Sequence, residues 1–108
     1  MVDNEFIIRE VIWEKNGVFL DTVSDMESVT ELNLANKGIT DVTPLALLTK
    51  LEKLDLYKNQ ITDLTPLAVL TKLEELGLGT NQITDLTPLA GITKLKELRL
   101  YLNDVNDL

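Results

Sequence analysis

Leucines alternate with polar residues along most of the chain, and the pattern recurs every 22 residues. Residues 51–72 read LEKLDLYKNQITDLTPLAVLTK and residues 73–94 read LEELGLGTNQITDLTPLAGITK, so the two segments match at 16 of 22 positions. The pattern also fills residues 29–50, and residues 95–108 begin a further copy. Self-similarity at this period predicts a solenoid, in which each repeat forms one coil and stacks on its neighbours.

Each repeat predicts two short elements. Leucines two residues apart, such as Leu54 and Leu56, predict a strand with one face turned inward. Thr65 and Pro66 follow, and a hydroxyl residue before proline predicts a helical N-cap with proline at the first helical position. Because a coil has only 22 residues, this turn should be a 3-10 helix. We therefore predict an α/β solenoid with a parallel sheet on its concave face and short 3-10 turns on its convex face.

Stacking turns equivalent positions of the repeats into columns. The leucines of the strands should fill the core, together with apolar residues of the convex side, at positions 32, 54, 76, 98, then 34, 56, 78, 100, and 48, 70, 92. Asn59, Asn81 and Asn103 form a polar column, and buried amides there would satisfy backbone groups of adjacent coils. Lys37 holds the equivalent position of the first repeat, so this ladder should begin at Asn59.

The N-terminal segment departs from the repeat and predicts a cap over the open end of the solenoid. Ile8, Val11 and Ile12 are spaced as one apolar stripe of a helix at about residues 5–15. A degenerate half-repeat should follow at residues 20–28, and we assign Trp13 to packing of the cap rather than to ligand contact. The predicted domains are thus a cap at 1–28 and repeats at 29–50, 51–72, 73–94 and, in part, 95–108.

Charge narrows the classes of partner. The chain carries 18 acidic and 10 basic residues, a formal net charge of -8. This excess repels nucleic-acid phosphates and anionic lipids, and no apolar run approaches the ~20 residues of a spanning helix. We expect no nucleic-acid partner and no membrane insertion. The absence of cysteine fits both a cytoplasmic protein and a secreted or surface-bound one that is part of a longer chain, so localisation stays open.

Catalytic patterns are missing from the sequence. The chain has no histidine or cysteine, its serines are Ser24 and Ser28 in the predicted cap, and it has no glycine-rich phosphate loop. We therefore expect no enzyme activity, no cofactor and no metal. One alternative concerns the column of Asp41, Asp63, Asp85 and Asp107, whose carboxylates could share a calcium ion. The simpler interpretation is that each aspartate accepts hydrogen bonds from its own Asp-x-Thr-Pro turn.

The motif Leu-x-x-Leu-x-Leu-x-x-Asn-x-Ile at Leu51 to Ile61, and again at Leu73 to Ile83, is typical of leucine-rich repeats. The segment Asn-Gln-Ile-Thr-Asp-Leu-Thr-Pro-Leu-Ala at 59–68 and 81–90 resembles the 22-residue repeats of bacterial internalin-type proteins. The likeness covers residues 29–108, and the segment before them resembles the helical caps of such proteins. The resemblance implies that the concave face binds a protein.

Candidate contact residues lie where the two most similar repeats differ. Four of the six differences between them fall on the concave side, which favours a recognition surface but also fits drift at exposed positions. The aromatic and charged residues there, and Arg99 and Tyr101 in the next repeat, are typical of binding hot spots. Gly77 and Gly79 leave either a shallow notch for a partner side chain or tolerated glycines in an exposed strand. The predicted partner-binding residues are Asp55, Tyr57, Lys58, Gly77, Gly79, Arg99 and Tyr101.

A second hypothesis concerns the C-terminal end. Leu102, Val105 and Leu108 are apolar and no polar capping segment follows them, so they could mediate self-association, for example in a homodimer. On this hypothesis the chain is a structural repeat scaffold without a dedicated ligand, either a fragment of a larger protein or a consensus-like design.

Overall fold

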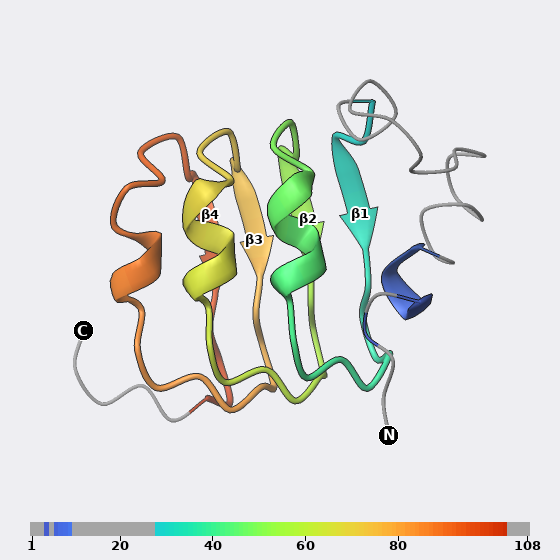
Figure 1. The fold of residues 1–108 in the computed structure, drawn as a ribbon. Helices are drawn as coiled ribbons and strands as arrows, with labels where there is room; N and C mark the ends of the chain where they lie inside the picture. The colour runs from blue at the N-terminus through green and yellow to red at the C-terminus, as the bar shows by residue number, and fades with distance from the viewer. Residues whose placement is uncertain (1–3, 5, 10–27, 104–108) are drawn as a thin grey trace.

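A single parallel sheet runs along the solenoid in the computed structural model, which describes residue 4, residues 6–9 and residues 28–103. Its strands follow chain order, and they are β1 (Glu31–Asn33), β2 (Lys53–Asp55), β3 (Glu75–Gly77) and β4 (Glu97–Arg99). Between them lie three 3-10 helices, namely η1 (Thr43–Leu47), η2 (Thr65–Val69) and η3 (Thr87–Leu89). Figure 1 shows the strands in one layer and the 3-10 helices in another. The structure confirms the predicted architecture.

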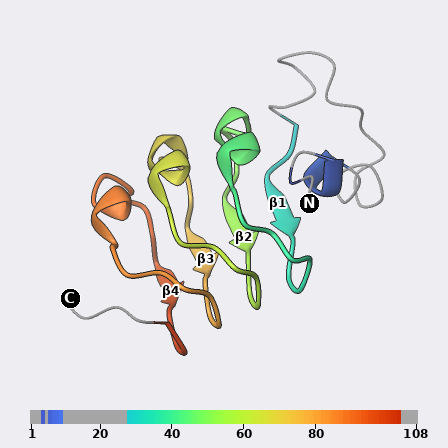
Figure 2. The same cartoon turned by 60° about the horizontal axis from the view of Figure 1, so that its bottom comes forward.

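The strands pair in a register of one repeat, so that equivalent positions are neighbours. Leu32 pairs with Leu54, and Leu54 pairs with Leu76. Figure 2 shows the strands closer together than the 3-10 helices, which places the sheet on the inner face of a bent stack. The bend follows from the repeat itself, since a helical turn is wider than a strand and the same difference recurs in every coil.

The predicted leucine columns form the core, except at their last member. Leu32, Leu54 and Leu76 are at most 4% exposed, and the convex residues Leu48, Leu70 and Ile92 are buried as well. Leu98 was expected in the same column, but it is 37% exposed. It lies on β4, which pairs with β3 on one side and with no other strand of the described residues. A leucine is buried in this fold by the coil on each side of it, and Leu98 has only one such coil among the described residues.

The asparagine ladder forms as predicted and begins at Asn59. The Oδ1 atom of Asn59 accepts a hydrogen bond from the backbone N–H of Ile39 at 2.9 Å, and its Nδ2 atom donates to Leu34 O at 3.0 Å and Leu56 O at 2.9 Å. Asn81 makes the equivalent bonds one repeat further on, and both side chains are 7% exposed. Each amide therefore joins two coils through backbone groups that would otherwise be buried without partners.

The convex turns are held by aspartate rather than by the threonine that we expected as N-cap. Thr65 is the first residue of η2, and its backbone N–H and hydroxyl both donate to Asp63 Oδ1, at 2.9 and 2.6 Å. Asp41 and Asp85 make the same pair of bonds with their threonines. The threonine hydroxyl is occupied by this contact, which accounts for the wrong assignment. The interpretation as a local turn acceptor is confirmed for Asp41, Asp63 and Asp85, whereas Asp107 lies outside the described residues.

These turns should make the fold sensitive to acid. Hydrogen bonds from the threonine hydroxyl, and next from the threonine backbone N–H, lower the pKa of each turn carboxyl from its ordinary value of 3.8. A carboxyl with a lowered pKa in the folded state stabilises the fold above the unfolded-state pKa, and this contribution is lost as the pH falls through the folded-state pKa. We expect the free energy of unfolding to decrease below about pH 4. Chemical denaturation at a series of pH values would measure the decrease.

The variant that tests this origin replaces Asp41, Asp63 and Asp85 with asparagine. Asparagine keeps the accepting oxygen but does not titrate, so the acid-dependent decrease should be smaller than in the wild-type protein. A variant with three other surface carboxylates neutralised, at Glu31, Glu52 and Glu97, controls for net charge. An equal pH dependence in the wild-type protein and the asparagine variant would contradict the assignment.

Only part of the predicted cap is described. Residues 6–9 are helical, and Ile8 is 1% exposed within the same core as the repeats. Asn4 binds the first coil, because its Oδ1 accepts from the backbone N–H groups of Thr40 and Asp41 at 2.9 and 3.2 Å. The rest of the predicted helix at 5–15, Trp13 and residues 20–27 of the half-repeat lie outside the described residues, so the predicted domain boundary stays a prediction. Within the described ranges, no helix has the length and apolar character needed to cross a bilayer.

Candidate functional site

The solvent-exposed, concave face of the sheet forms a groove that crosses all four strands. Since side chains alternate along a strand, the residues on either side of each buried leucine point away from the core. They enclose a groove of about 460 Å³, here called the concave groove. Asn33 and Gly77 lie in the groove at the positions equivalent to Asp55 in their own strands. The charged residues of the lining are Glu31, Lys53, Asp55, Glu75, Glu97 and Arg99.

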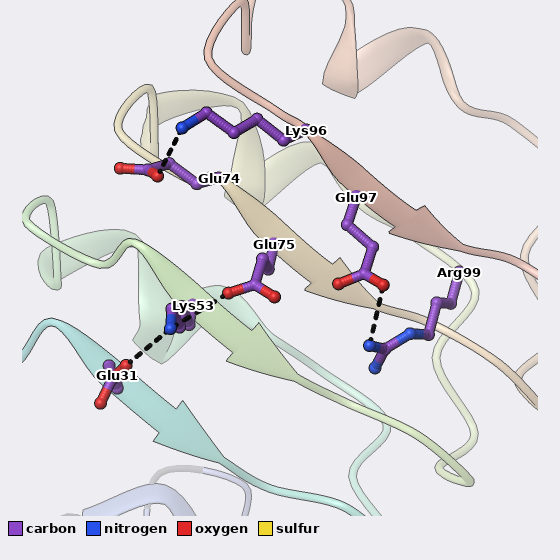
Figure 3. A network of polar contacts seen from close by, with 7 residues as sticks. All are labelled: Glu31, Lys53, Glu74, Glu75, Lys96, Glu97 and Arg99. Carbon is purple, nitrogen blue, oxygen red and sulfur yellow. Dashed lines mark hydrogen bonds and ion pairs between the residues drawn. The ribbon is translucent and has the colours of Figure 1, made fainter.

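Ion pairs cross the concave groove from strand to strand. Lys53 Nζ lies 3.4 Å from Glu31 Oε1 and 3.3 Å from Glu75 Oε2, so one lysine on β2 joins carboxylates of β1 and β3. Arg99 Nη2 lies 3.0 Å from Glu97 Oε1 on the same strand. Figure 3 shows these side chains in a row over the sheet, with the Glu74–Lys96 pair beside them. All of these pairs are exposed to solvent, so they arrange charge on the surface more than they stabilise the fold.

Contacts within the groove shift the pKa of Glu75, Lys53 and Arg99 toward the charged form of each side chain. A hydrogen bond with Glu97, and then the contact with Lys53, lower the pKa of the Glu75 carboxyl. Glu75 and Glu31 raise the pKa of Lys53, and Glu97 raises the pKa of Arg99. These three side chains are thus charged at neutral pH, so the concave groove presents charges of both signs.

An aromatic pair lies directly beyond the charged rows. Tyr57 and Tyr101 are two repeats apart, yet their ring centroids are 6.0 Å apart with an interplanar angle of 43°. They are 37% and 56% exposed. A tilted ring pair at this distance is a favourable aromatic geometry, and it leaves both rings open to solvent on one side.

Gly79 is what allows the two tyrosines to meet. It lies between them in the same column, and a Cβ atom built on it would stand only 2.8 Å from Tyr101 Cζ. Gly77 is covered in the same way, because a Cβ there would stand 2.9 Å from Asp55 Oδ1. Both glycines are buried. Of the two interpretations of these glycines, the open notch is wrong in this structure, since the chain's own Tyr101 and Asp55 side chains fill it.

Lys58 belongs to a backbone feature that the sequence analysis missed. Its φ angle is +58°, in the left-handed region that non-glycine residues rarely adopt. The same angle recurs once in each coil, at Asn36, Lys58, Thr80 and Leu102. Of these four residues, only Asn36 is of a type that tolerates this conformation well. The residue types at these positions therefore gave little indication of the positive φ angles. The exposed Lys58 side chain thus leaves the sheet from a turn at the end of the strand.

Apart from Lys58, the predicted residues that the structure describes fall into three places. Asp55, Gly77 and Arg99 line the concave groove, whereas Tyr57, Gly79 and Tyr101 form the aromatic column beside it. Leu102 is 74% exposed near the outer edge of β4, while Val105 and Leu108 lie outside the described residues. Sequence reasoning did not select the glutamates of the groove, although the two-residue alternation around each strand leucine was a signal for them. They are Glu31, Glu75 and Glu97.

The repeats of the chain match a known protein family and several solved structures. The family model for leucine-rich repeats, in two copies, matches residues 27–69 and 49–91. A comparison with curated protein sequences gave no match.

Solved structures of internalins from Listeria monocytogenes are similar over most of the chain. An internalin, inlF, is 38% identical over 96% of this chain with a TM-score of 0.86, and internalin C2 is 48% identical over 82% with a TM-score of 0.75. The functional domain of InlJ is 29% identical over 98% of this chain with a TM-score of 0.81. The chain spans 31%, 41% and 23% of these three proteins. The chain belongs to the leucine-rich-repeat family, and its repeats are of the bacterial internalin type.

Proposed function

We propose that the chain is a non-catalytic module that binds a protein partner on its concave face. The contact surface would comprise the concave groove and the Tyr57–Tyr101 pair. The observation that carries the proposal is this pair of exposed rings, held 6.0 Å apart over Gly79 beside the groove. Exposed tyrosines that are already positioned lose little side-chain freedom on binding, which is why they are frequent among binding hot spots.

The distribution of sequence differences supports the same face. At the strand positions, the two most similar repeats differ where their side chains line the groove, with Lys53 opposite Glu75 and Asp55 opposite Gly77. The buried leucines and the asparagine ladder are the same in both repeats. A uniform scaffold with a varied outer face is what recognition by a solenoid requires.

The experiment is affinity capture from extracts of the source organism and of candidate target cells. The test variant carries Tyr57→Ala, Arg99→Ala and Tyr101→Ala, which remove exposed side chains only. A control variant carries Leu47→Ala and Val69→Ala, since these side chains are 60% and 52% exposed on the convex turns. Both variants should have the circular dichroism spectrum and melting temperature of a folded protein.

We expect a protein that is retained by the wild type and by the convex control but lost by the concave variant. Removal of hot-spot side chains of this kind weakens binding by about 2 kcal/mol or more each, which is enough to abolish capture. Capture of the same proteins by all three forms, or by none, would contradict the proposal.

A second candidate function is self-association along the outer edge of β4. Leu98 and Leu102 are 37% and 74% exposed there, and β4 pairs on this side with no other described strand. Such an edge next to apolar side chains favours pairing with another copy. Sedimentation at increasing protein concentration tests this candidate. Leu102→Asn should weaken association, because asparagine tolerates the positive φ of +59° while removing the apolar contact. The convex variant Leu47→Asn is the control, and a monomer at all concentrations would exclude this function.

A further inference from the structure

We infer that the concave groove receives a cationic side chain, an arginine in particular, from a polypeptide partner. This inference rests on the proposed function and names the chemistry of its partner. It follows from three properties of the groove, which are its net charge, the contacts of its own cations and the position of the tyrosine pair.

The groove lining has an excess of negative charge. Four carboxylates, those of Glu31, Asp55, Glu75 and Glu97, face the two cationic side chains of Lys53 and Arg99, which leaves a net charge of -2. The whole chain has the same sign, with a formal net charge of -8. A basic segment is therefore attracted over a distance and an acidic one is repelled, which affects both the rate and the specificity of association.

The two cations of the groove are already engaged by carboxylates. Lys53 lies between Glu31 and Glu75, and Arg99 lies against Glu97. Asp55 differs, because its Oδ1 accepts the backbone N–H of Tyr57 at 3.0 Å, while among the described residues no cationic side chain lies within ion-pair distance of it. The carboxylate of Asp55 leans over Gly77, and both residues line the concave groove. Of the four carboxylates, Asp55 is thus the one without an ion pair among the described residues.

The aromatic pair completes a site for a planar cation. Tyr57 follows Asp55 by two residues and is exposed, so both side chains lie on the same face of the coil. A guanidinium group can make two parallel hydrogen bonds with a carboxylate and can also lie against an aromatic ring. The ammonium group of lysine attracts a carboxylate as a point charge and lacks the planar pair of donors that makes two parallel hydrogen bonds. The combination of carboxylate and ring therefore favours arginine over lysine.

The test uses short peptides as probes and the 108-residue chain as the protein. The peptide acetyl-Gly-Arg-Gly-amide is titrated while the backbone amide resonances are followed by NMR. The peptide with citrulline in place of arginine is the matched control, because it has the same shape without the charge. We expect saturable shifts at Asp55, Tyr57, Glu75 and Gly77 with the arginine peptide, smaller shifts with the equivalent lysine peptide and none with citrulline. Higher salt should weaken the binding.

Two protein variants locate the site. The first carries Asp55→Asn and Glu75→Gln. Asparagine fits at position 55, because Asn33 at the equivalent position of β1 accepts the Ala35 N–H on its Oδ1 at 2.9 Å. The second carries Glu52→Gln and Asp63→Asn, which remove the same charge outside the groove lining. At about 0.2 to 1 kcal/mol for each lost ion pair, the first variant should bind the peptide about two- to thirtyfold more weakly. The second should bind within about twofold of the wild type.

Equal binding by the two variants, or equal shifts with arginine and citrulline, would overturn the inference. Its failure can be told apart from failure of the proposed function. If a captured protein depends on Tyr57, Arg99 and Tyr101 but binds the Asp55→Asn, Glu75→Gln variant normally, the concave face is a binding site and the cationic contact is wrong. If the arginine peptide binds the groove but no captured protein depends on the concave face, the groove chemistry holds and the proposed function fails.

Discussion

Replacing Asn59 with alanine should lower the free energy of unfolding by about 3 to 5 kcal/mol, measured by urea denaturation. The side chain accepts from the N–H groups of Lys37 and Ile39 and donates to the carbonyl groups of Leu34 and Leu56. The N–H groups of Lys37 and Ile39 and the carbonyl of Leu34 lose this partner at once, whereas Leu56 O keeps the bond from Asn81 Nδ2 at 3.0 Å. The site is too enclosed for full replacement by water, since Asn59 is 7% exposed. The cost is therefore larger than that of one ordinary hydrogen bond.

The matched control is Asn33→Ala. Asn33 is exposed and accepts one hydrogen bond, from the backbone N–H of Ala35. Its replacement should cost about 0.5 to 1 kcal/mol. If the two alanine variants were equally stable, the asparagine ladder would not hold the coils together.

Leu56→Ala should lower the free energy of unfolding by about 2 to 5 kcal/mol. Leu56 is 0% exposed, between the equivalent leucines Leu34 and Leu78, which are also fully buried. Removing its side chain leaves a cavity between the two neighbouring coils, because the leucines packed around it relax only in part. Thermal and urea denaturation should both show the loss.

The control for this prediction is Leu47→Ala. Leu47 has the same side chain, but it is 60% exposed on the convex helix η1. The expected loss is under about 1 kcal/mol, since little buried surface is removed. A loss as large as that of Leu56→Ala would show that the convex turns contribute to the core more than their exposure indicates.

The fold could be predicted from the sequence because the repeat constrains it many times over. The alternation of apolar and polar residues around Leu54 would be weak evidence for a strand if it occurred once, but the same alternation returns every 22 residues. The parallel register follows without further information, since only a shift of one repeat brings Leu54 onto Leu32 and Leu76. The aspartate turns were predicted for the same reason.

The details that were wrong or missed depend on contacts between particular coils. Nothing in the strand pattern shows that the Tyr101 ring turns back over Gly79 to meet Tyr57, because that contact joins residues two repeats apart. The exposure of Leu98 depends on its neighbours rather than on its own repeat. Positive φ angles at Lys58 and Thr80 are set by the closure of the coil, against the preference of the residues themselves.

The register of one repeat also bears on how such a chain can change over generations. Each of the four described strands pairs only with its neighbours in sequence, and the side-chain bonds of Asn59 and Asn81 reach no further than the adjacent coil. An in-frame duplication of one 22-residue unit would therefore meet matching hydrogen-bond partners at both of its junctions. It would lengthen the groove by one strand, and later substitutions in that strand would change the lining of the groove without disturbing the older coils.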